Sequence, residues 1–255
     1  MDRELSGKTA LVTGASRGIG AATSLALAGR GAERLILHYN SNAAGIAKVA
    51  EAAQKAGSKT ETIQADLGTG SGIEAFLKDL GRRSGPGIDI LINNAGSLVQ
   101  RARLAEYTPE LFDRVMALNV KSAWFIAQAV APQMIERKTG VMVNVSSIAA
   151  RNGGGIGATI YAAAKAAIST ITKGLAKELA PHGIRVNAVS PGTVDNDFHA
   201  QFSTRQMLDS VIAATPAGTL GTNEEVADTI LFLCSHAARY IHGQTIEING
   251  GMFMV

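Results

Sequence analysis

Short apolar runs alternate with longer helix-like segments from one end of the chain to the other. The runs are continuously apolar rather than alternating, as expected for strands that helices cover on both faces. This order of elements is typical of a parallel sheet in an α/β protein. The predicted strands are residues 9–14, 34–39, 59–66, 88–96, 141–147, 184–192 and 244–250. The predicted helices are residues 19–30, 43–55, 73–80, 109–137 and 161–180.

Length and composition agree with one domain built on this sheet. The chain has 255 residues, of which 46% are hydrophobic, which is enough for one well-buried α/β domain and somewhat short for two. We therefore predict a single domain over residues 1–255, with a doubly wound, parallel, seven-stranded sheet and helices on both faces. The sequence shows no internal repeats and no low-complexity tracts.

Charge and cysteine content exclude several function classes. The 24 basic and 21 acidic residues give a net charge of +3 without a run of one sign, so no nucleic-acid partner is indicated. No apolar stretch approaches the ~20 residues that span a bilayer, and the first residues lack the features of a secretion signal. The single cysteine, Cys234, excludes an internal disulfide and fits a reducing compartment. We expect a cytoplasmic protein with no membrane partner, and the scattered histidines indicate no metal site.

A glycine-rich segment follows the first predicted strand and opens the first predicted helix. It reads TGASRGIG over residues 13–20. Glycines let a ligand approach the backbone closely, and the N–H groups and dipole of a helix N-terminus favour a pyrophosphate. The segment therefore predicts a dinucleotide site in a Rossmann-like fold, although its spacing is GxxxGxG rather than the commoner GxGxxG.

Tyr161 and Lys165 are four residues apart in the segment IYAAAKAA. In a helix these positions share one face, so the lysine ammonium can reach the neighbourhood of the tyrosine phenol. A cation at roughly 4 Å in an effective dielectric of about 20 favours the phenolate by on the order of 4 kcal/mol, or about 3 pK units. We therefore expect Lys165 to bring the pKa of Tyr161 close to working pH.

Taken together, these segments resemble the short-chain dehydrogenase/reductase family, from about Lys8 to Gly251. The matching segments, in chain order, are TGASRGIG, Asp66 after the third strand, NNAG at 93–96, Asn119 in ALNV, NVSS at 144–147, YAAAK at 161–165, and Pro191 with Gly192. The resemblance implies an oxidoreductase that moves a hydride between a nicotinamide cofactor and a carbonyl or secondary alcohol.

The resemblance also implies the roles of a catalytic set. Tyr161 donates the proton that the carbonyl oxygen needs when hydride transfer makes it an alkoxide. Ser147 holds the substrate oxygen, with Ser146 as the competing hydroxyl, and Lys165 also grips the nicotinamide ribose. Asn119 anchors a water that links Lys165 to solvent.

Cofactor contacts are expected along the carboxyl ends of the strands. Asp66 is expected to contact the adenine, NNAG to line the site, and Pro191 with Gly192 to border the nicotinamide. The full predicted set is Gly14, Ser16, Arg17, Gly18, Ile19, Gly20, Tyr39, Asn40, Ser41, Asp66, Leu67, Asn93, Ala95, Gly96, Tyr161, Lys165, Pro191, Gly192 and Val194.

The end of the second strand bears on which dinucleotide is used. Enzymes that choose NAD usually place a carboxylate there, about 20 residues after the glycine turn, to bind the ribose hydroxyls. This chain has His38, Tyr39, Asn40 and Ser41 instead, and Arg17 stands in the glycine turn, where it can meet a phosphate. We therefore predict NADP(H), with NAD(H) as the alternative.

Two segments depart from the family pattern or are left open. The loop at 148–160 is rich in glycine, which either makes room for a bulky substrate or forms a loose turn. Asn196 stands where the family commonly has a threonine that meets the nicotinamide amide, with Thr193 as a substitute. Residues 193–215 are expected to form a lid over the substrate; ordinary packing of a short helix is the alternative.

Substrate and partners remain open between classes. Reductases of 3-oxoacyl chains on an acyl carrier protein have a similar organisation, but their carrier-docking positions fall near Lys138 and His182, neither of which is arginine. Arg101, Arg103 and Arg151 are alternative contributors to carrier docking. Free ketones, sugars or polyols are the other substrates.

The resemblance suggests a homotetramer. It would be built on the helical region 109–137, the helix after Tyr161 and the C-terminal end.

Two rival functions remain for this sequence. One is a dinucleotide-sensing binding protein without catalysis, and the other is a hydrolase that uses Ser147 and Lys165.

Overall fold

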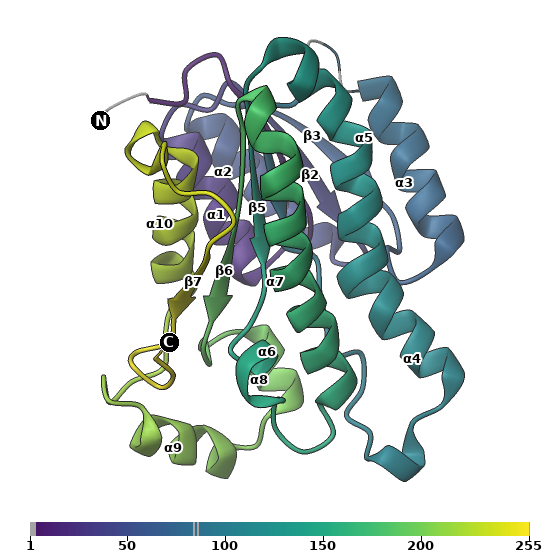
Figure 1. Cartoon of the computed structure of the whole chain (residues 1–255), viewed down its shortest axis with the longest axis vertical. Helices are drawn as coiled ribbons and strands as arrows, with labels where there is room; N and C mark the ends of the chain where they lie inside the picture. Colours follow the sequence, from purple (N-terminus) through teal and green to yellow (C-terminus); the bar gives the residue numbers. More distant parts are fainter. Residues whose placement is uncertain (1–3, 84, 86, 255) are drawn as a thin grey trace.

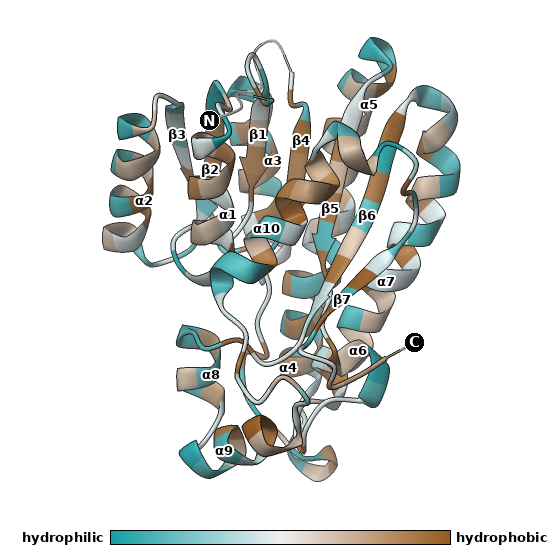
Figure 2. Ribbon diagram, turned by 90° about the vertical axis from the view of Figure 1, so that its left-hand side faces the viewer, coloured by the Kyte–Doolittle hydropathy of each residue, from teal (hydrophilic) through white to brown (hydrophobic). Residues whose placement is uncertain are grey.

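The computed structural model describes residues 4–83, 85 and 87–254. Within these residues, parallel strands form one seven-stranded sheet in the order β3-β2-β1-β4-β5-β6-β7. Figure 1 draws the whole fold, and the strand order can be followed in Figure 2. The strands are β1 (Thr9–Val12), β2 (Arg34–Tyr39), β3 (Lys59–Gln64), β4 (Ile90–Asn93), β5 (Gly140–Val145), β6 (Ile184–Pro191) and β7 (Thr245–Ile248). The strand order reverses direction between β1 and β4, which is the switch point where such sheets bind ligands. The predicted fold class is confirmed.

Helices cover both faces of the sheet, and two apolar clusters fill the spaces between. One cluster joins the strands to α1 (Gly18–Gly29), α2 (Ala43–Lys55) and α10 (Asn223–Cys234). The other joins them to α3 (Gly70–Arg83), α5 (Ser122–Arg137) and α7 (Thr159–Leu179). Side chains of β2 alternate between the clusters, because Leu35 and Leu37 belong to the first and Ile36 to the second. The central strands β1 and β4 are therefore mostly apolar, as their brown colour in Figure 2 shows, whereas the edge strands β3 (KTETIQ) and β7 (TIEI) also carry polar residues.

The remaining helices lie between or beyond these layers. They are α4 (Pro109–Met116), α6 (Ala149–Asn152), α8 (Asp197–Phe202) and α9 (Arg205–Ala214), with short turns η1 (Leu104–Glu106), η2 (Ala117–Lys121), η3 (Ala180–His182) and η4 (His236–Ala238). Figure 2 shows α8 and α9 together beyond the end of the sheet, apart from the sheet-covering helices. No helix in the described residues combines the length and the apolar character needed to cross a membrane.

Most predicted elements match in place, but the long helix α10 and the short helix α6, in the predicted loop 148–160, were not predicted. The start of α10 carries a capping box, in which the Thr222 hydroxyl accepts from the Glu225 N–H at 3.2 Å while Glu225 accepts from the Thr222 N–H at 2.7 Å. Val226, Ile230 and Leu233 are buried at helical spacing. The capping-box residues and the helical spacing of the apolar residues are both present in the sequence, which therefore contains the signals that predict α10.

Arg185 on β6 fixes the C-terminal end of α10. Its guanidinium donates to four main-chain carbonyls: those of Leu233, Cys234, Ser235 and Ala238. These are carbonyls that a helix end leaves without intrahelical partners. One side chain therefore ties the end of α10 to the sheet.

We predict that Arg185→Ala lowers the free energy of unfolding by about 2 to 4 kcal/mol, because several buried carbonyls lose a charged donor. Arg185→Lys should restore only part of this, since an ammonium cannot span the same acceptors. Urea unfolding followed by circular dichroism measures the change. The exposed Arg239 is the control, and its replacement by alanine should shift stability by less than about 0.5 kcal/mol; equal losses for the two variants would contradict the assignment.

Candidate active site

A cavity of about 850 Å³ lies at the carboxyl ends of the strands. Its walls include residues that directly follow each strand, from Gly14 after β1 to Asn249 after β7. Of the sequence-predicted site residues, those that line it are Gly14, Ser16, Arg17, Gly18, Ile19, Asn40, Ser41, Asp66, Leu67, Ala95, Gly96, Ser147, Tyr161, Lys165, Pro191, Gly192 and Val194. Gly20, Tyr39, Asn93 and Asn119 are not among the lining residues.

The glycine turn has the conformation that its sequence requires. Gly14 and Gly18 have φ of +67° and +58°, in the region that favours glycine. A Cβ on Gly20 would lie 2.2 Å from the Gly14 carbonyl oxygen, so this glycine permits close packing of the turn on α1. Arg17 is the N-cap residue of α1 and its side chain makes no capping bond. The first N–H groups of α1 therefore face the cavity without a side-chain acceptor, which suits a phosphate.

His38 holds the glycine turn from β2, and sequence analysis did not assign it a role. Its Nδ1 accepts from the Gly14 N–H at 3.1 Å, and its Nε2 lies 3.0 Å from the Ala65 carbonyl oxygen. Because Nδ1 accepts, the proton must be on Nε2, which donates to Ala65. Burial lowers the pKa of His38 to about 4, so the imidazole stays neutral. A polar residue inside an apolar strand next to the turn was the available signal.

The wall after β2 carries polar side chains and no carboxylate. Asn40, Ser41 and Asn42 line it, and the Asn42 side chain caps α2 by accepting from the Gly45 N–H at 2.9 Å. Arg17 lies opposite, exposed, with a guanidinium nitrogen 3.8 Å from a carboxylate oxygen of Asp197. Tyr39 packs, partly buried, against the apolar cluster under α1 and α2 and is not among the residues that line the cavity, so its predicted contact with the cofactor loses support.

Asp66 is held at the end of β3 by two contacts. Its Oδ2 lies 2.9 Å from the Arg114 guanidinium on α4, and its Oδ1 accepts from the Gly68 N–H at 3.0 Å. Asp66, Leu67 and Arg114 all line the cavity. Asp66 therefore lies in the cavity wall with an arginine partner that the sequence did not reveal, and its contact with the adenine stays a prediction.

The NNAG segment after β4 divides into structural and cavity-lining residues. Asn93 is buried and donates to Asn144 Oδ1 at 3.0 Å and to the Ala123 carbonyl at 3.3 Å, so it links β4 to β5 and α5. Its predicted cofactor contact is therefore not supported by its position. Asn94 lines the cavity, as expected for the NNAG segment, although it was not in the predicted set of cofactor contacts, and it donates to the carbonyls of Thr13 and Gly14 at 2.8 and 3.1 Å.

Gly96 brings Asn119 and Lys165 together. A Cβ on Gly96 would lie 2.7 Å from Asn119 Oδ1 and 2.8 Å from Lys165 Nζ, so a larger residue here would displace these two side chains. Asn119 sits on the π-helical turn η2 and donates to Val115 O at 2.8 Å and to Ser97 O at 2.9 Å. The first of these bonds satisfies a main-chain carbonyl of the preceding helical turn. Single π-helical turns of this kind often occur at functional sites.

Tyr161 and Lys165 lie on the same face of α7, as their spacing predicts. Lys165 is 3% exposed, and its Nζ donates to the Val145 carbonyl at 2.8 Å. The same nitrogen lies 5.7 Å from the centre of the Tyr161 ring. The ammonium is thus a neighbour of the ring.

The protein groups around Tyr161 do not produce the expected acidification. Burial raises the pKa of Tyr161 to about 12, and a hydrogen bond with the Ser147 hydroxyl only partly opposes the rise. Burial also lowers the pKa of Lys165 to about 8. Moving either charged group out of water costs free energy, and this cost outweighs the attraction that a nearby ammonium would offer the phenolate.

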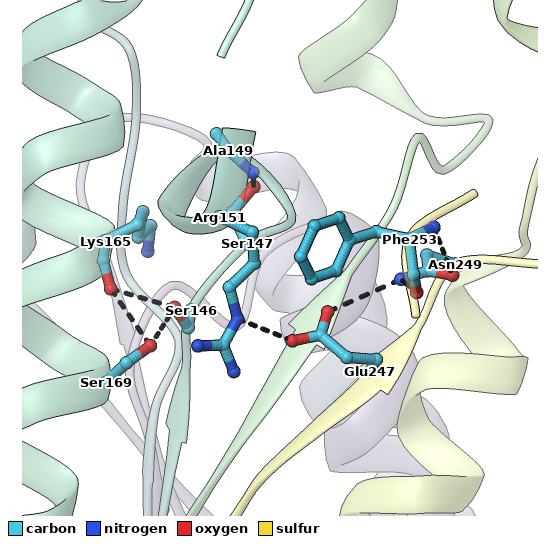
Figure 3. A network of polar contacts seen from close by, with 9 residues as sticks. All are labelled: Ser146, Ser147, Ala149, Arg151, Lys165, Ser169, Glu247, Asn249 and Phe253. Carbon is cyan, nitrogen blue, oxygen red and sulfur yellow. Dashed lines mark hydrogen bonds and ion pairs between the residues drawn. The ribbon is translucent and has the colours of Figure 1, made fainter. Parts of the chain in front are cut away.

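Ser146 and Ser147 face different surroundings, as Figure 3 shows. The Ser146 hydroxyl donates to the Lys165 carbonyl and lies 2.8 Å from the Ser169 hydroxyl, so it serves the packing of α7 on β5. The Ser147 hydroxyl accepts from the Ala149 N–H at 3.1 Å and reaches Tyr161. Ser147 is therefore the hydroxyl that shares the cavity with the tyrosine.

The segment after β6 differs from expectation at Asn196. Its Oδ1 accepts from the N–H groups of Phe198 and His199, and its Nδ2 donates to Asn223 Oδ1 at 3.0 Å. Asn196 is therefore the N-cap of α8, although it also lines the cavity. Its amide is already engaged on both sides, so the predicted contact with the nicotinamide amide loses support.

Helix α8 closes one side of the cavity. The Phe198 ring lies 5.8 Å from the Tyr161 ring, centre to centre. Arg151, a predicted contributor to carrier docking, instead pairs with Glu247 at 2.7 Å and so joins α6 to β7, as Figure 3 shows.

In the described residues no group of three side chains of the metal-binding types is close enough to hold an ion.

Comparison with known proteins gives the family. The family model described as enoyl-(acyl carrier protein) reductase matches residues 14–253. This chain belongs to the short-chain dehydrogenase/reductase family. The uncharacterised oxidoreductase YmfI of Bacillus subtilis is 38% identical, over 96% of this chain and 98% of that protein. The 3-oxoacyl-[acyl-carrier-protein] reductase FabG of Staphylococcus epidermidis is 36% identical, over 97% and 99%.

Solved structures of this family bind either nicotinamide dinucleotide. The NADH-dependent reductase A1-R′, responsible for alginate metabolism, is 35% identical with a TM-score of 0.88, covering 99% of this chain and 100% of that one. A 3-oxoacyl (acyl-carrier-protein) reductase of Agrobacterium tumefaciens C58 with NADP bound is 32% identical with a TM-score of 0.88, covering 98% and 95%. The family oxidoreductases thus support a nicotinamide dinucleotide here, without deciding which.

Proposed function

We propose that this protein is an NADP(H)-dependent oxidoreductase that interconverts a carbonyl and a secondary alcohol. The observation that carries the proposal is one cavity in which the glycine turn and the group of Ser147, Tyr161 and Lys165 share the walls. The cofactor would supply or accept the hydride. A purely dinucleotide-sensing protein would not need the hydrogen-bonded hydroxyl pair of Ser147 and Tyr161.

The residues of the chain would handle the proton and the developing charge. The Ser147 hydroxyl donates a hydrogen bond to the carbonyl oxygen, and the Tyr161 hydroxyl donates the proton as that oxygen becomes an alkoxide. Lys165, buried beside the ring, stabilises the phenolate that remains. Asn119 is proposed to anchor a water on the path that returns the proton, through the second acceptor position of its Oδ1, because this oxygen lies near Gly96 and Lys165 and already accepts from the Ser97 N–H at 3.2 Å.

We predict that Tyr161→Phe lowers kcat for carbonyl reduction by at least about 100-fold while cofactor affinity stays within about 3-fold, because only the proton donor is lost. Lys165→Ala should lower both kcat and cofactor affinity. Stopped-flow NADPH oxidation and quenching of NADPH fluorescence measure the two quantities. Tyr107→Phe is the matched control and should keep both; near-normal turnover by Tyr161→Phe would refute the proton-donor role.

The walls of the adenine-ribose region favour NADP(H) over NAD(H). A carboxylate that would repel a 2′-phosphate is missing after β2, where Asn40, Ser41 and Asn42 stand. The capped N-terminus of α2 lies behind these residues and adds positive potential. Arg17 is exposed next to the cavity and can leave its long contact with Asp197 to meet a phosphate.

We expect kcat/KM to be at least about 10-fold higher with NADPH than with NADH, since a charge-assisted contact to phosphate contributes on the order of 1.5 to 3 kcal/mol. Arg17→Ala should lower the value for NADPH and leave that for NADH nearly unchanged. Initial rates with each cofactor measure the ratio, with the exposed Arg30→Ala at the end of α1 as the control. Equal or better use of NADH by the unaltered protein would defeat the NADP(H) assignment.

The names of the relatives suggest two classes of substrate. The FabG relatives make a 3-oxoacyl thioester on an acyl carrier protein one candidate, whereas the A1-R′ reductase makes a free carbonyl compound the other. For carrier docking, Arg151 is committed to Glu247, and Lys138 and His182 supply only weak positive character. The substrate is therefore proposed as a carbonyl compound, with the free compound and the carrier-bound thioester as alternatives.

The remaining expectations stay part of the proposal. Residues 193–215 are proposed as a lid, because Phe198, Phe202 and Met207 from α8 and α9 line the cavity. A cytoplasmic homotetramer is proposed from the family resemblance. The apolar side chains Phe112 and Trp124 on α4 and α5 are 43% and 40% exposed, which supports an interface on these helices.

A further inference from the structure

Arg101 is held rigidly in the cavity by two segments that face each other. It follows β4 and lines the cavity. Its Nε donates to the Phe202 carbonyl at the end of α8 at 2.7 Å. Its Nη1 donates to the Ile156 carbonyl in the glycine-rich loop before α7 at 2.8 Å. The guanidinium therefore has a fixed place between the lid segment and the glycine-rich loop.

These two bonds leave both the charge and several donors of Arg101 unused. Main-chain carbonyls are uncharged, and a guanidinium has five N–H groups, of which two are engaged here. The cavity's other arginines each have a carboxylate, since Arg17 lies 3.8 Å from Asp197 and Arg114 lies 2.9 Å from Asp66. Over residues 4–83, 85 and 87–254, no carboxylate forms an ion pair with Arg101. A partly buried charge without a counterion is costly unless a ligand supplies one.

The polar side chains next to Arg101 carry no positive charge that could bind an anion in its place. His199 on α8 also lines the cavity, and its Nδ1 lies 3.0 Å from the Ser203 hydroxyl. Burial, and next the charge of Arg101, lower the pKa of His199 to about 4, so its imidazole is neutral at pH 7. His199 and Ser203 are suited to hydrogen bonds with hydroxyl groups. Arg101 is then the cation of this part of the cavity.

We propose that Arg101 binds a carboxylate of the substrate, so that the enzyme reduces a hydroxylated oxo acid in preference to a neutral ketone or an acyl thioester. The proposal rests on the proposed oxidoreductase function and names the substrate class for that site. A carboxylate matches the planar fork of a guanidinium with two parallel hydrogen bonds. The reacting carbonyl lies at Ser147 and Tyr161, and the anchored end lies at Arg101.

The test compares carbonyl compounds that differ only in the carboxylate. One pair is 5-oxogluconate and L-sorbose, in which a carboxylate is replaced by a hydroxymethyl group; another is 4-oxopentanoate and 4-oxopentanamide. A 3-oxobutanoyl thioester completes the panel. Initial rates are measured with NADPH and with NADH. We expect kcat/KM for the preferred oxo acid to exceed that of its neutral partner by at least about 10-fold, mainly through KM.

Variants separate carboxylate binding from a merely structural role of Arg101. Arg101→Gln loses the charge and should bring the ratio of oxo acid to neutral partner close to one. Loosening of the lid would instead lower both rates and keep the ratio. Arg101→Lys keeps the charge without the fork and should restore part of the ratio. Arg103→Gln removes an exposed charge two residues away and should leave the ratio unchanged.

Different outcomes would overturn the carboxylate site and the proposed oxidoreductase function. Equal rates for both members of each pair, an unchanged ratio in Arg101→Gln, or a thioester used better than every oxo acid would overturn the carboxylate site alone. Reduction of no carbonyl compound with either cofactor would overturn the proposed function and with it the substrate class.

Discussion

Lys165 carries its amine into the protein beside Tyr161, where, among the residues that the structure describes, the Val145 carbonyl accepts a hydrogen bond from it at 2.8 Å. In this environment burial lowers the pKa of the amine to about 8 and raises that of the phenol to about 12. The protein groups around the pair thus disfavour an ammonium and a phenolate alike. A cationic nicotinamide and the ribose hydroxyls would favour the phenolate and give the amine further acceptors. On this account, the tyrosine becomes a proton donor of suitable acidity only when the cofactor is bound.

The parallel sheet explains why these groups meet. All strands run in one direction, so the residues after each strand gather at one edge, and the cavity is lined by them. Small residues at this edge allow the close approaches, as at Gly96 between Asn119 and Lys165 and at Gly20 against the Gly14 carbonyl. Buried polar side chains fix the edge in place, with His38 holding the glycine turn and Asn93 joining β4 to β5.

The order of elements could be predicted from the sequence because it depends on local signals. Continuous apolar runs, the glycine turn and the i, i+4 spacing of Tyr161 and Lys165 all survive in the structure. Long-range partners could not be predicted in this way. The pairing of Asp66 with Arg114, the bond from Asn196 to Asn223 and the bond from Arg101 to Phe202 join residues 48, 27 and 101 positions apart in ways that only packing decides.

Burial was the other quantity that the sequence did not supply. The spacing of Tyr161 and Lys165 placed a cation near a phenol, but the sign of the pKa shift depended on how much solvent each group lost. Likewise Tyr39 and Asn93 had the right position along the chain for cofactor contacts, and their side chains turned to the core and to a neighbouring strand instead. The identity of a site residue can follow from a motif, whereas its environment requires the fold.

The ionisation of Tyr161 is the most direct test of this account. Spectrophotometric titration of tyrosinate, with and without NADP⁺, should be compared between the unaltered protein and Tyr161→Phe. The account predicts one phenol that titrates above pH 10 in the free protein, shifts to well below 10 when NADP⁺ binds, and is missing from the variant. A Tyr161 titration that bound NADP⁺ leaves unchanged would contradict it.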